Sequence, residues 1–152
     1  MNCVFYEIVT GAIPCHLIWE GDTHMAFLSS HPNTEGFSVV IPKRHYSSYI
    51  FAQDDSVASA LVLAARKVAL ILDQALDDVG RTGMIFEGYG VDHLHAKLFP
   101  MHGTGNSSEF KPIASSYMKY FQKYEGYISS HDAAKADEAE LTELARRIRE
   151  YA

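Results

Sequence analysis

Polar and apolar side chains alternate strictly along the stretch His93-Leu94-His95-Ala96-Lys97-Leu98. Such alternation is typical of a β-strand with one buried face, because successive side chains on a strand point to opposite sides. We therefore expect the three apolar residues to face a core, while His93, His95 and Lys97 line the opposite face. An imidazole can act as a nucleophile, a proton carrier or a metal ligand at neutral pH, and the lysine adds a fixed positive charge. A row of this kind suits a phosphate or another anion.

Four other segments have the composition of strands, at 16–20, 24–29, 37–41 and 82–87. The first two are separated by Gly21-Asp22-Thr23, which predicts a tight hairpin turn and antiparallel pairing. The third ends at Pro42, which has no N–H to donate to a sheet and so predicts the exit of that strand.

Two helices are expected. Apolar residues recur every three or four positions over 57–79, which predicts one long amphipathic helix. Asp55 or Ser56 is its expected N-cap, and Gly80 is expected to end it. The other helix lies near the end of the chain, where one apolar stripe is formed by Leu141, Leu144, Ala145, Ile148 and Tyr151. Strands before and after a helix predict an α+β domain.

We expect a core over 1–102 and a C-terminal extension over 103–152 that packs on the same domain. The extension contains a tyrosine-rich segment, 117–127, with three interpretations: it covers a pocket, buries a subunit contact or packs locally.

The composition limits the class of protein. A chain of 152 residues that is 47% hydrophobic can bury one sizeable core. A net charge of −6, with 13 basic against 19 acidic residues, argues against a partner bound through a nucleic-acid backbone. No apolar run is long enough to cross a membrane, and residues 1–10 lack the organisation of a signal peptide. We expect a soluble cytoplasmic protein without a membrane partner, in which Cys3 and Cys15 form no disulfide.

Three sequence elements carry a family resemblance: Ala26-Phe27-Leu28, Val39-Val40-Ile41-Pro42-Lys43-Arg44-His45, and Gly88-Tyr89-Gly90-Val91-Asp92-His93-Leu94-His95. In this order and spacing the chain resembles the histidine triad (HIT) superfamily of nucleotide hydrolases and transferases. The resemblance implies a HIT-like five-stranded antiparallel sheet with one long helix. It also implies a homodimer whose two sheets join across the interface.

The resemblance implies the chemistry of the histidine row as well. His95 would attack the α-phosphate of a purine nucleotide conjugate and form a covalent nucleotidyl-histidine, which water then hydrolyses. His93 would orient and polarise His95, and His45 would support the site as a hydrogen-bonding partner. No cofactor is implied.

The resemblance places a nucleotide pocket beside these histidines. Phe5, Ile8 and Phe27 match positions that wall the base pocket, although ordinary core packing explains them equally well. Amides around Gly88 and Gly90 could cradle the phosphate, or these glycines could serve only the turn.

The chain departs from the family pattern at several positions. Lys97 stands where the family has its third histidine. Its positive charge could interact with the phosphate or the leaving group. Alternatively, it serves only to keep the protein soluble or to protect the edge of the sheet from pairing with another chain. Ser29 stands where relatives place an aspartate on the ribose hydroxyls, and it is a weaker, uncharged partner. With Phe86 and Glu87 before it, the glycine-containing loop is shortened. A variant leaving-group preference is the expected consequence.

Two other functions are compatible with these residues. One is a non-catalytic nucleotide-binding or interaction module, favoured by the loss of the third histidine and the ribose aspartate. The other is a metal-dependent hydrolase in which His93, His95 and either His45 or His102 hold the ion, although no suitably spaced carboxylate supports it. Some relatives hold a structural zinc through a Cys-x-x-Cys pair. In this chain Cys3 occupies the first cysteine position and Tyr6 replaces the second, so we expect no metal.

Overall fold

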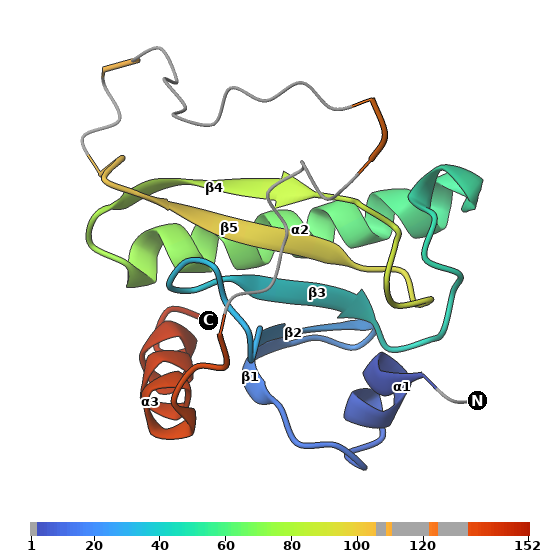
Figure 1. Ribbon diagram of the computed structural model, residues 1–152, viewed down its shortest axis with the longest axis horizontal. Coiled ribbons are helices and arrows are strands. Elements are labelled where there is room, and N and C mark those ends of the chain that lie inside the picture. Colours follow the sequence, from blue (N-terminus) through green and yellow to red (C-terminus); the bar gives the residue numbers. More distant parts are fainter. Residues whose placement is uncertain (1–2, 106–108, 111–121, 125–133) are drawn as a thin grey trace.

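A computed structural model describes residues 3–105, 109–110, 122–124 and 134–152. Figure 1 shows one five-stranded sheet with helices packed against it. The strands lie in the order β1-β2-β3-β5-β4, and every neighbouring pair is antiparallel. Their bounds are β1 His16–Glu20, β2 His24–Leu28, β3 Ser38–Pro42, β4 Val79–Ile85 and β5 Ala96–His102. The α+β, HIT-like fold expected from the sequence is therefore confirmed.

In the described part of the chain the helical elements are α1 Val4–Val9, the short 3-10 helix η1 Ile50–Ala52, α2 Asp55–Ala75 and α3 Glu138–Arg149. The long helix α2 packs along β3, β4 and β5, and α3 packs against β1 and α2 (Figure 1). Among the residues that the structure describes, no helix is long and apolar enough to cross a membrane.

The two faces of the sheet bury separate apolar clusters. On the α2 face, Leu94, Ala96 and Leu98 join a large core with residues from α2 and α3. On the opposite face, Phe27 and Val39 belong to a smaller cluster against which α1 packs. The predicted alternation along 93–98 is therefore present, with the apolar residues turned toward α2.

The start of β5 differs from the sequence prediction. His93 and His95 precede the strand, which begins at Ala96. The backbone turns at His93, whose N–H donates to the carbonyl of Val91, and the N–H of Leu94 donates to Tyr46 outside the sheet. This segment keeps the alternation of a strand without its ladder hydrogen bonds, so periodicity alone places the strand too early.

The end of α2 also differs. The helix begins at Asp55 and ends at Ala75, so the N-cap position is Asp54 instead of the predicted Asp55 or Ser56, and its side chain makes no capping hydrogen bond. Val79 and Gly80, predicted as the last turn of the helix and the residue that ends it, belong to β4. Val79 is still buried in the core. A helix and a strand that both deliver apolar residues to one core cannot be separated at their junction by periodicity.

The C-terminal helix follows the prediction closely. Asp137 caps α3 by accepting hydrogen bonds from the N–H groups of Ala139 and Glu140. The predicted apolar stripe is buried except for Tyr151, which lies beyond the helix and is exposed. Most of the tyrosine-rich segment 117–127 lies outside the described residues; Tyr124 is within them.

Candidate functional site

A cavity of about 390 Å³ lies on the α1 face of the sheet, where His95 and Lys97 point away from α2. Its walls come from α1, from the end of β2, from the loop before β5 and from the first turn of α3. The residues predicted for the site that line it are Phe5, Ile8, Phe27, Ser29, Gly90, His95 and Lys97.

His95 is held in one tautomer. Its Nδ1 atom lies 2.6 Å from the main-chain carbonyl oxygen of His93, which can only accept, so Nδ1 carries the hydrogen. The unprotonated Nε2 atom of the neutral ring is then the nucleophilic nitrogen. Burial lowers the pKa of His95 below the ordinary imidazole value, and the charge of Lys97 lowers it further, whereas the His93 carbonyl and Glu87 act in the opposite direction. The ring is only 3% exposed, yet it lines the cavity.

His93 lies behind His95 and does not line the cavity. Its Nε2–H donates to the carbonyl of Pro42 at 2.9 Å, which leaves Nδ1 as an acceptor. Burial lowers the pKa of His93, while the hydrogen bond to Pro42 opposes that shift. The contact that orients His95 comes from the main-chain carbonyl of His93, whereas sequence analysis considered only the two rings.

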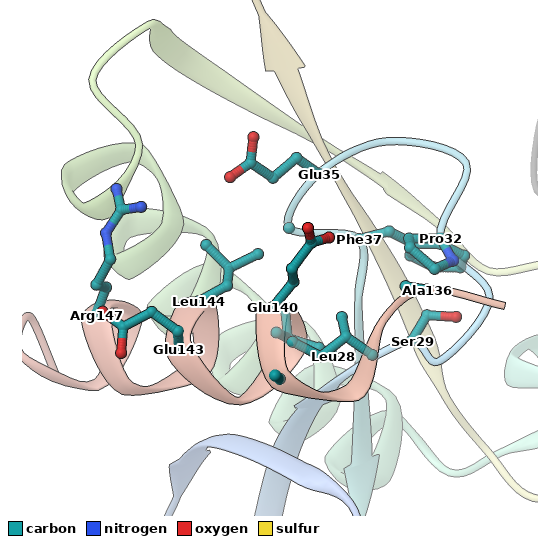
Figure 2. Close-up of a pocket in the computed structure, with 13 residues that line it drawn as sticks. Leu28, Ser29, Pro32, Glu35, Phe37, Ala136, Glu140, Glu143, Leu144 and Arg147 are labelled. Carbon is teal, nitrogen blue, oxygen red and sulfur yellow. The ribbon is translucent and has the colours of Figure 1, made fainter.

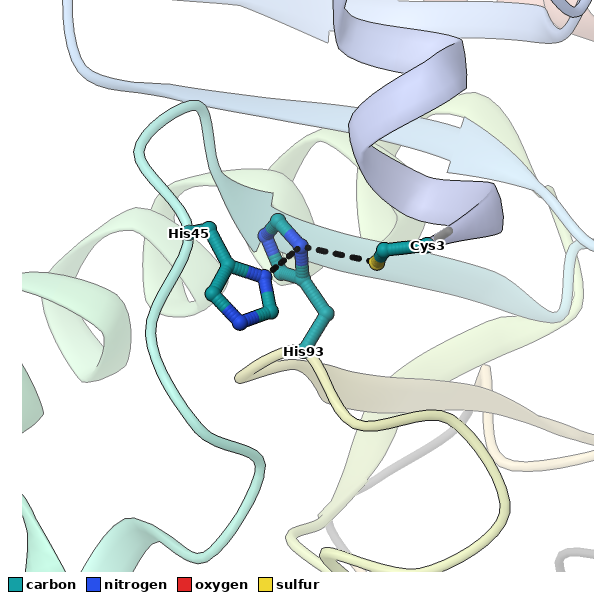
Figure 3. Close-up of side chains that lie close together, drawn as sticks. All are labelled: Cys3, His45 and His93. Atoms are coloured by element: carbon teal, nitrogen blue, oxygen red, sulfur yellow. Dashed lines mark hydrogen bonds between the residues drawn. The ribbon is translucent and has the colours of Figure 1, made fainter. Parts of the chain in front are cut away.

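Cys3, His45 and His93 form a cluster at the back of the site (Figure 3). The Nδ1 atom of His93 lies 3.5 Å from the Cys3 Sγ and 3.4 Å from the Nδ1 of His45. These contacts join the start of α1 to the loop after β3 and the loop before β5. His45 thus contacts His93 directly and does not line the candidate cavity itself.

The three ligand atoms of this cluster lie within 4.8 Å of one another, close enough to share a metal ion. A tetrahedral zinc would space such atoms by about 3.3–3.6 Å, which the contacts at His93 match. A closed structural zinc site, however, uses four protein ligands, and the described residues offer three here. The cluster is also satisfied without an ion, because the Cys3 S–H or a His45 N–H can donate to the unprotonated Nδ1 of His93. The residue set therefore does not fit a structural zinc.

The alternative metal set considered from the sequence is not assembled. His95 is absent from the cluster, and His102 lies at the other end of β5, where its Nδ1 is 2.9 Å from Asp78 and its Nε2 is 2.9 Å from the carbonyl of Glu35. Within the described residues His93 and His95 do not form the shared site considered from the sequence, because the two ring nitrogens of His93 face other partners: Pro42 on one side, and Cys3 and His45 on the other.

Lys97 pairs with a buried carboxylate. Its Nζ lies 2.8 Å from Oε2 of Glu87, and the two side chains are only 17% and 13% exposed. The hydroxyl of Tyr124 donates to the other carboxylate oxygen, Oε1, at 2.5 Å. Sequence analysis noted Glu87 only as part of a shortened loop and gave Tyr124 no individual role. No periodicity signal links these three positions, because they lie on different elements.

The predicted base-pocket residues meet at one end of the cavity. The rings of Phe5 and Phe27 contact edge to face with centroids 5.7 Å apart, and Phe5 also contacts the His95 ring at 5.3 Å. Phe5 and Ile8 are placed there by α1, which sequence analysis did not predict. Phe27 is also part of the apolar cluster on this face, so the pocket and core interpretations overlap.

The two glycines of the loop occupy different places. Gly90 lines the cavity, with φ of +92°, and a Cβ built there would meet nothing within 4 Å. Gly88, with φ of +63°, packs instead against the backbone of Ser48 and Tyr49, where a Cβ would lie 3.2 Å from the Ser48 carbonyl oxygen. Of the two, only Gly90 can therefore approach a ligand in this cavity.

Other cavity residues had no role in the sequence analysis. Tyr89 and Val91 flank Gly90, and His16 from β1 contacts Glu138 of α3, with Nε2 and Oε2 2.8 Å apart. Glu138 places a carboxylate from the C-terminal extension on the cavity wall that also contains Ser29.

A second, larger cavity of about 680 Å³ lies between α3 and the loop that joins β2 to β3 (Figure 2). Its floor is apolar, with Phe37 and Leu144, and its rim carries Glu35, Glu140 and Arg147. None of the histidines or Lys97 lines it. We place the candidate site in the smaller cavity because the nucleophilic nitrogen is there.

Comparison with known proteins identifies relatives over most of the chain. Residues 10–104 match the HIT domain. The chain is 31% identical over 123 residues to an adenosine 5'-monophosphoramidase of Schizosaccharomyces pombe, covering 78% of this chain and 92% of that protein. It is 30% identical over 106 residues to an adenylylsulfatase of Arabidopsis thaliana, covering 65% of this chain and 52% of that protein. A Hit-like protein from Bartonella henselae shares the fold, with a TM-score of 0.68 at 22% identity over 99% of this chain and 97% of that one.

Proposed function

The chain belongs to the HIT domain family, and from this membership we propose that it is a hydrolase or nucleotidyl transferase acting at the α-phosphate of a purine nucleotide conjugate. The observation that carries the proposal is the tautomer of His95, whose Nδ1–H is bonded to a carbonyl so that Nε2 keeps a lone pair, in a side chain that lines the cavity. The names of two relatives, a phosphoramidase and an adenylylsulfatase, support adenylyl conjugates as the substrate class.

The proposed reaction has two displacements at phosphorus. In the first, Nε2 of His95 forms a bond to the α-phosphorus while the bond to the leaving group breaks, and the leaving group takes the electron pair. The ring becomes positively charged, and the His93 carbonyl stabilises that charge through Nδ1–H. In the second, a water oxygen replaces Nε2 on phosphorus, releases its proton to solvent and returns His95 to its neutral form.

The surrounding residues support binding and orientation in this proposal. Phe5, Ile8 and Phe27 hold the base in the apolar end of the cavity, and Gly90 lets the backbone approach the phosphate. Ser29 faces the ribose. His45 and His93 fix the segment from which the orienting carbonyl projects.

The test combines turnover with detection of the intermediate. The protein is incubated with adenosine phosphoramidate, adenosine 5'-phosphosulfate and diadenosine polyphosphates, and released AMP is measured. Acid-quenched samples are analysed by mass spectrometry for an adenylyl group on His95. We expect His95→Ala to lose both AMP release and the adduct, with a rate lower by about 10³-fold or more, by analogy with loss of other catalytic nucleophiles.

His102→Ala is the matched control, because it removes an imidazole from the far end of β5, the strand that follows His95. It is expected to keep activity. Micromolar AMP binding without turnover or an adduct would instead establish the alternative, a non-catalytic nucleotide-binding module.

A further inference from the structure

Lys97 lines the candidate cavity beside His95, at the position where the resemblance places the family's third histidine. It follows His95 by two residues and lines the same cavity. Its contact with Glu87 is a short ion pair between two mostly buried side chains, so this cation is held in place instead of moving freely as a surface lysine does. A fixed cation beside the reacting phosphate acts on whatever group leaves it.

We propose that Lys97, positioned by Glu87 and Tyr124, makes this protein selective for nucleotide conjugates whose leaving group departs as an oxyanion, such as sulfate or phosphate, over phosphoramidates. This inference rests on the proposed function. It adds a substrate class to that function and brings Tyr124 from the C-terminal extension into the site.

The selectivity follows from how each bond breaks. When a P–O bond to sulfate or phosphate breaks, the oxygen keeps the electron pair and leaves as a stable anion without needing a proton. When a P–N bond breaks, the amine must receive a proton, because an amide anion is too basic to leave. An imidazolium, with a reference pKa of about 6.5, gives up a proton far more readily than an ammonium, at about 10.4. A lysine therefore stabilises a departing anion well and serves an amine poorly.

Glu87 and Tyr124 act through Lys97 as positioning residues. One oxygen of the Glu87 carboxylate accepts from the lysine and the other accepts from the tyrosine hydroxyl, so both ends of the carboxylate are fixed. Removing the tyrosine hydroxyl leaves the ion pair with Lys97 in place and removes the hydrogen bond to the other oxygen of the Glu87 carboxylate. Replacing Glu87 by glutamine keeps the shape and removes the negative charge opposite Lys97.

The first experiment needs no variant. The specificity constant kcat/KM of the intact protein is measured for adenosine 5'-phosphosulfate and for adenosine 5'-phosphoramidate, which share the adenylyl group. We expect the sulfate conjugate to be favoured by about 10²-fold or more, the usual effect of one well-placed electrostatic group. An equal or reversed preference, with normal adenylylation of His95, overturns this inference and leaves the proposed function standing. No turnover and no adduct with either conjugate overturns both.

Variants then assign the preference to Lys97. Lys97→Met is expected to lower kcat/KM for the sulfate conjugate by about 10²-fold and to affect the phosphoramidate less. Lys97→His is expected to move the preference toward the phosphoramidate, since an imidazolium can protonate the amine. Lys43→Met is the control, because it breaks a Lys–Glu pair of similar length, 2.7 Å to Glu20, outside the cavity. Loss of the same factor on both substrates in Lys97→Met would contradict the assignment.

A series of aryl esters of AMP tests the positioning residues. With Lys97 in place, the rate should depend weakly on the pKa of the leaving phenol, because the cation shares its developing charge. The dependence should steepen in Lys97→Met, and partly in Glu87→Gln and Tyr124→Phe, while Glu87→Asp restores part of the effect. An unchanged slope in Glu87→Gln and Tyr124→Phe would reduce these residues to a structural role.

Discussion

Cys3 contacts both the imidazole ring of His93 and the main chain just before it. Its Sγ lies 3.5 Å from His93 Nδ1 and 4.0 Å from the carbonyl oxygen of Asp92. The thiol is buried and joins the start of α1 to the loop that carries His93 and His95. We expect Cys3→Ala to lower the midpoint of thermal unfolding and to raise KM for the nucleotide, because α1 also carries Phe5 and Ile8 of the pocket.

Cys15→Ala is the control for the unfolding and metal measurements, because Cys15 is a second free thiol that takes no part in this cluster. It is no control for KM, since Cys15 lines the cavity. Elemental analysis and chelator treatment accompany the two variants. We expect no stoichiometric metal in the intact protein and no change in its unfolding midpoint with chelator. Stoichiometric zinc that disappears in Cys3→Ala would show that the cluster is a metal site after all.

At the scale of single residues, the sequence located His95 and Lys97 because alternation is a property of neighbours along the chain. It could not reveal the tautomer of His95, which depends on where the His93 carbonyl points. It also could not reveal the pairing of Lys97 with Glu87, because the two residues meet only when β4 and β5 pair and the intervening loop folds back. The contact from Tyr124 comes from a still more distant part of the chain.

The loop between β4 and β5 sets the position of the histidines, and its two glycines give a matched test. In both Gly88→Ala and Gly90→Ala the new side chain must adopt a positive φ, which costs about 1 kcal/mol. Gly88→Ala has the added close approach to the Ser48 carbonyl, so we expect the larger loss of unfolding free energy there. Gly90→Ala is expected to act mainly on nucleotide affinity, because Gly90 lines the cavity.

Thermal unfolding and AMP titration of both variants check this prediction. Equal stability losses with equal effects on affinity would contradict the different roles of the two glycines.

The end of β5 carries a pH-dependent contact away from the catalytic site. The carbonyl of Glu35 and the carboxylate of Asp78 raise the pKa of His102, and His102 in turn holds the pKa of Asp78 below its ordinary value. The histidine contribution to stability is therefore fully present below its unfolded pKa, about 6.5, and is lost as the pH rises through the higher folded pKa. The aspartate contribution is lost only when the pH falls through its lowered folded value.

We accordingly expect His102→Gln to reduce the unfolding free energy more at pH 5.5 than at pH 8.5. Denaturant titrations at the two pH values measure this difference. A larger loss at the alkaline pH would show that the neutral form of His102 makes the important contacts.

At the scale of elements, the strands were predictable because each has one buried face and clear turn residues. The helix α1 was missed because its six residues are too few to show a period, and its apolar side chains resembled general core. The consequence is functional, since the position of the pocket residues Phe5 and Ile8 depends on that helix. The junction between α2 and β4 was misplaced because both elements feed the same core.

At the scale of the whole molecule, the two edges of the sheet differ. The β1 edge lies beside α3, whose Arg149 guanidinium donates to the Leu17 carbonyl. The β4 edge pairs with β5 on one side only, and in the described part of the chain no other strand pairs with it. An open edge of this kind is covered in many proteins by a second copy, which extends the sheet across a two-fold axis.

Exposed apolar side chains on β4 and on α2, the helix that packs against it, support the same arrangement. Met84 of β4 is 41% exposed, and Leu63 and Leu70 of α2 are 65% and 45% exposed. The two leucines are seven residues apart and so lie on one exposed face of α2. Another face of this helix packs against β4. We propose that these residues bury one another in a homodimer joined through β4 and α2.

Sedimentation at low micromolar concentration is expected to show a dimer for the intact protein. The double variant Leu63→Glu, Leu70→Glu should shift it to a monomer without lowering helix content, because like charges would meet across the two-fold axis at sites already exposed in a single subunit. Tyr151→Ser, which removes another exposed apolar group beyond α3, should leave the dimer unchanged. A dimer that survives the double glutamate variant but is lost in Tyr151→Ser would move the interface to the α3 side of the molecule, where the second cavity lies.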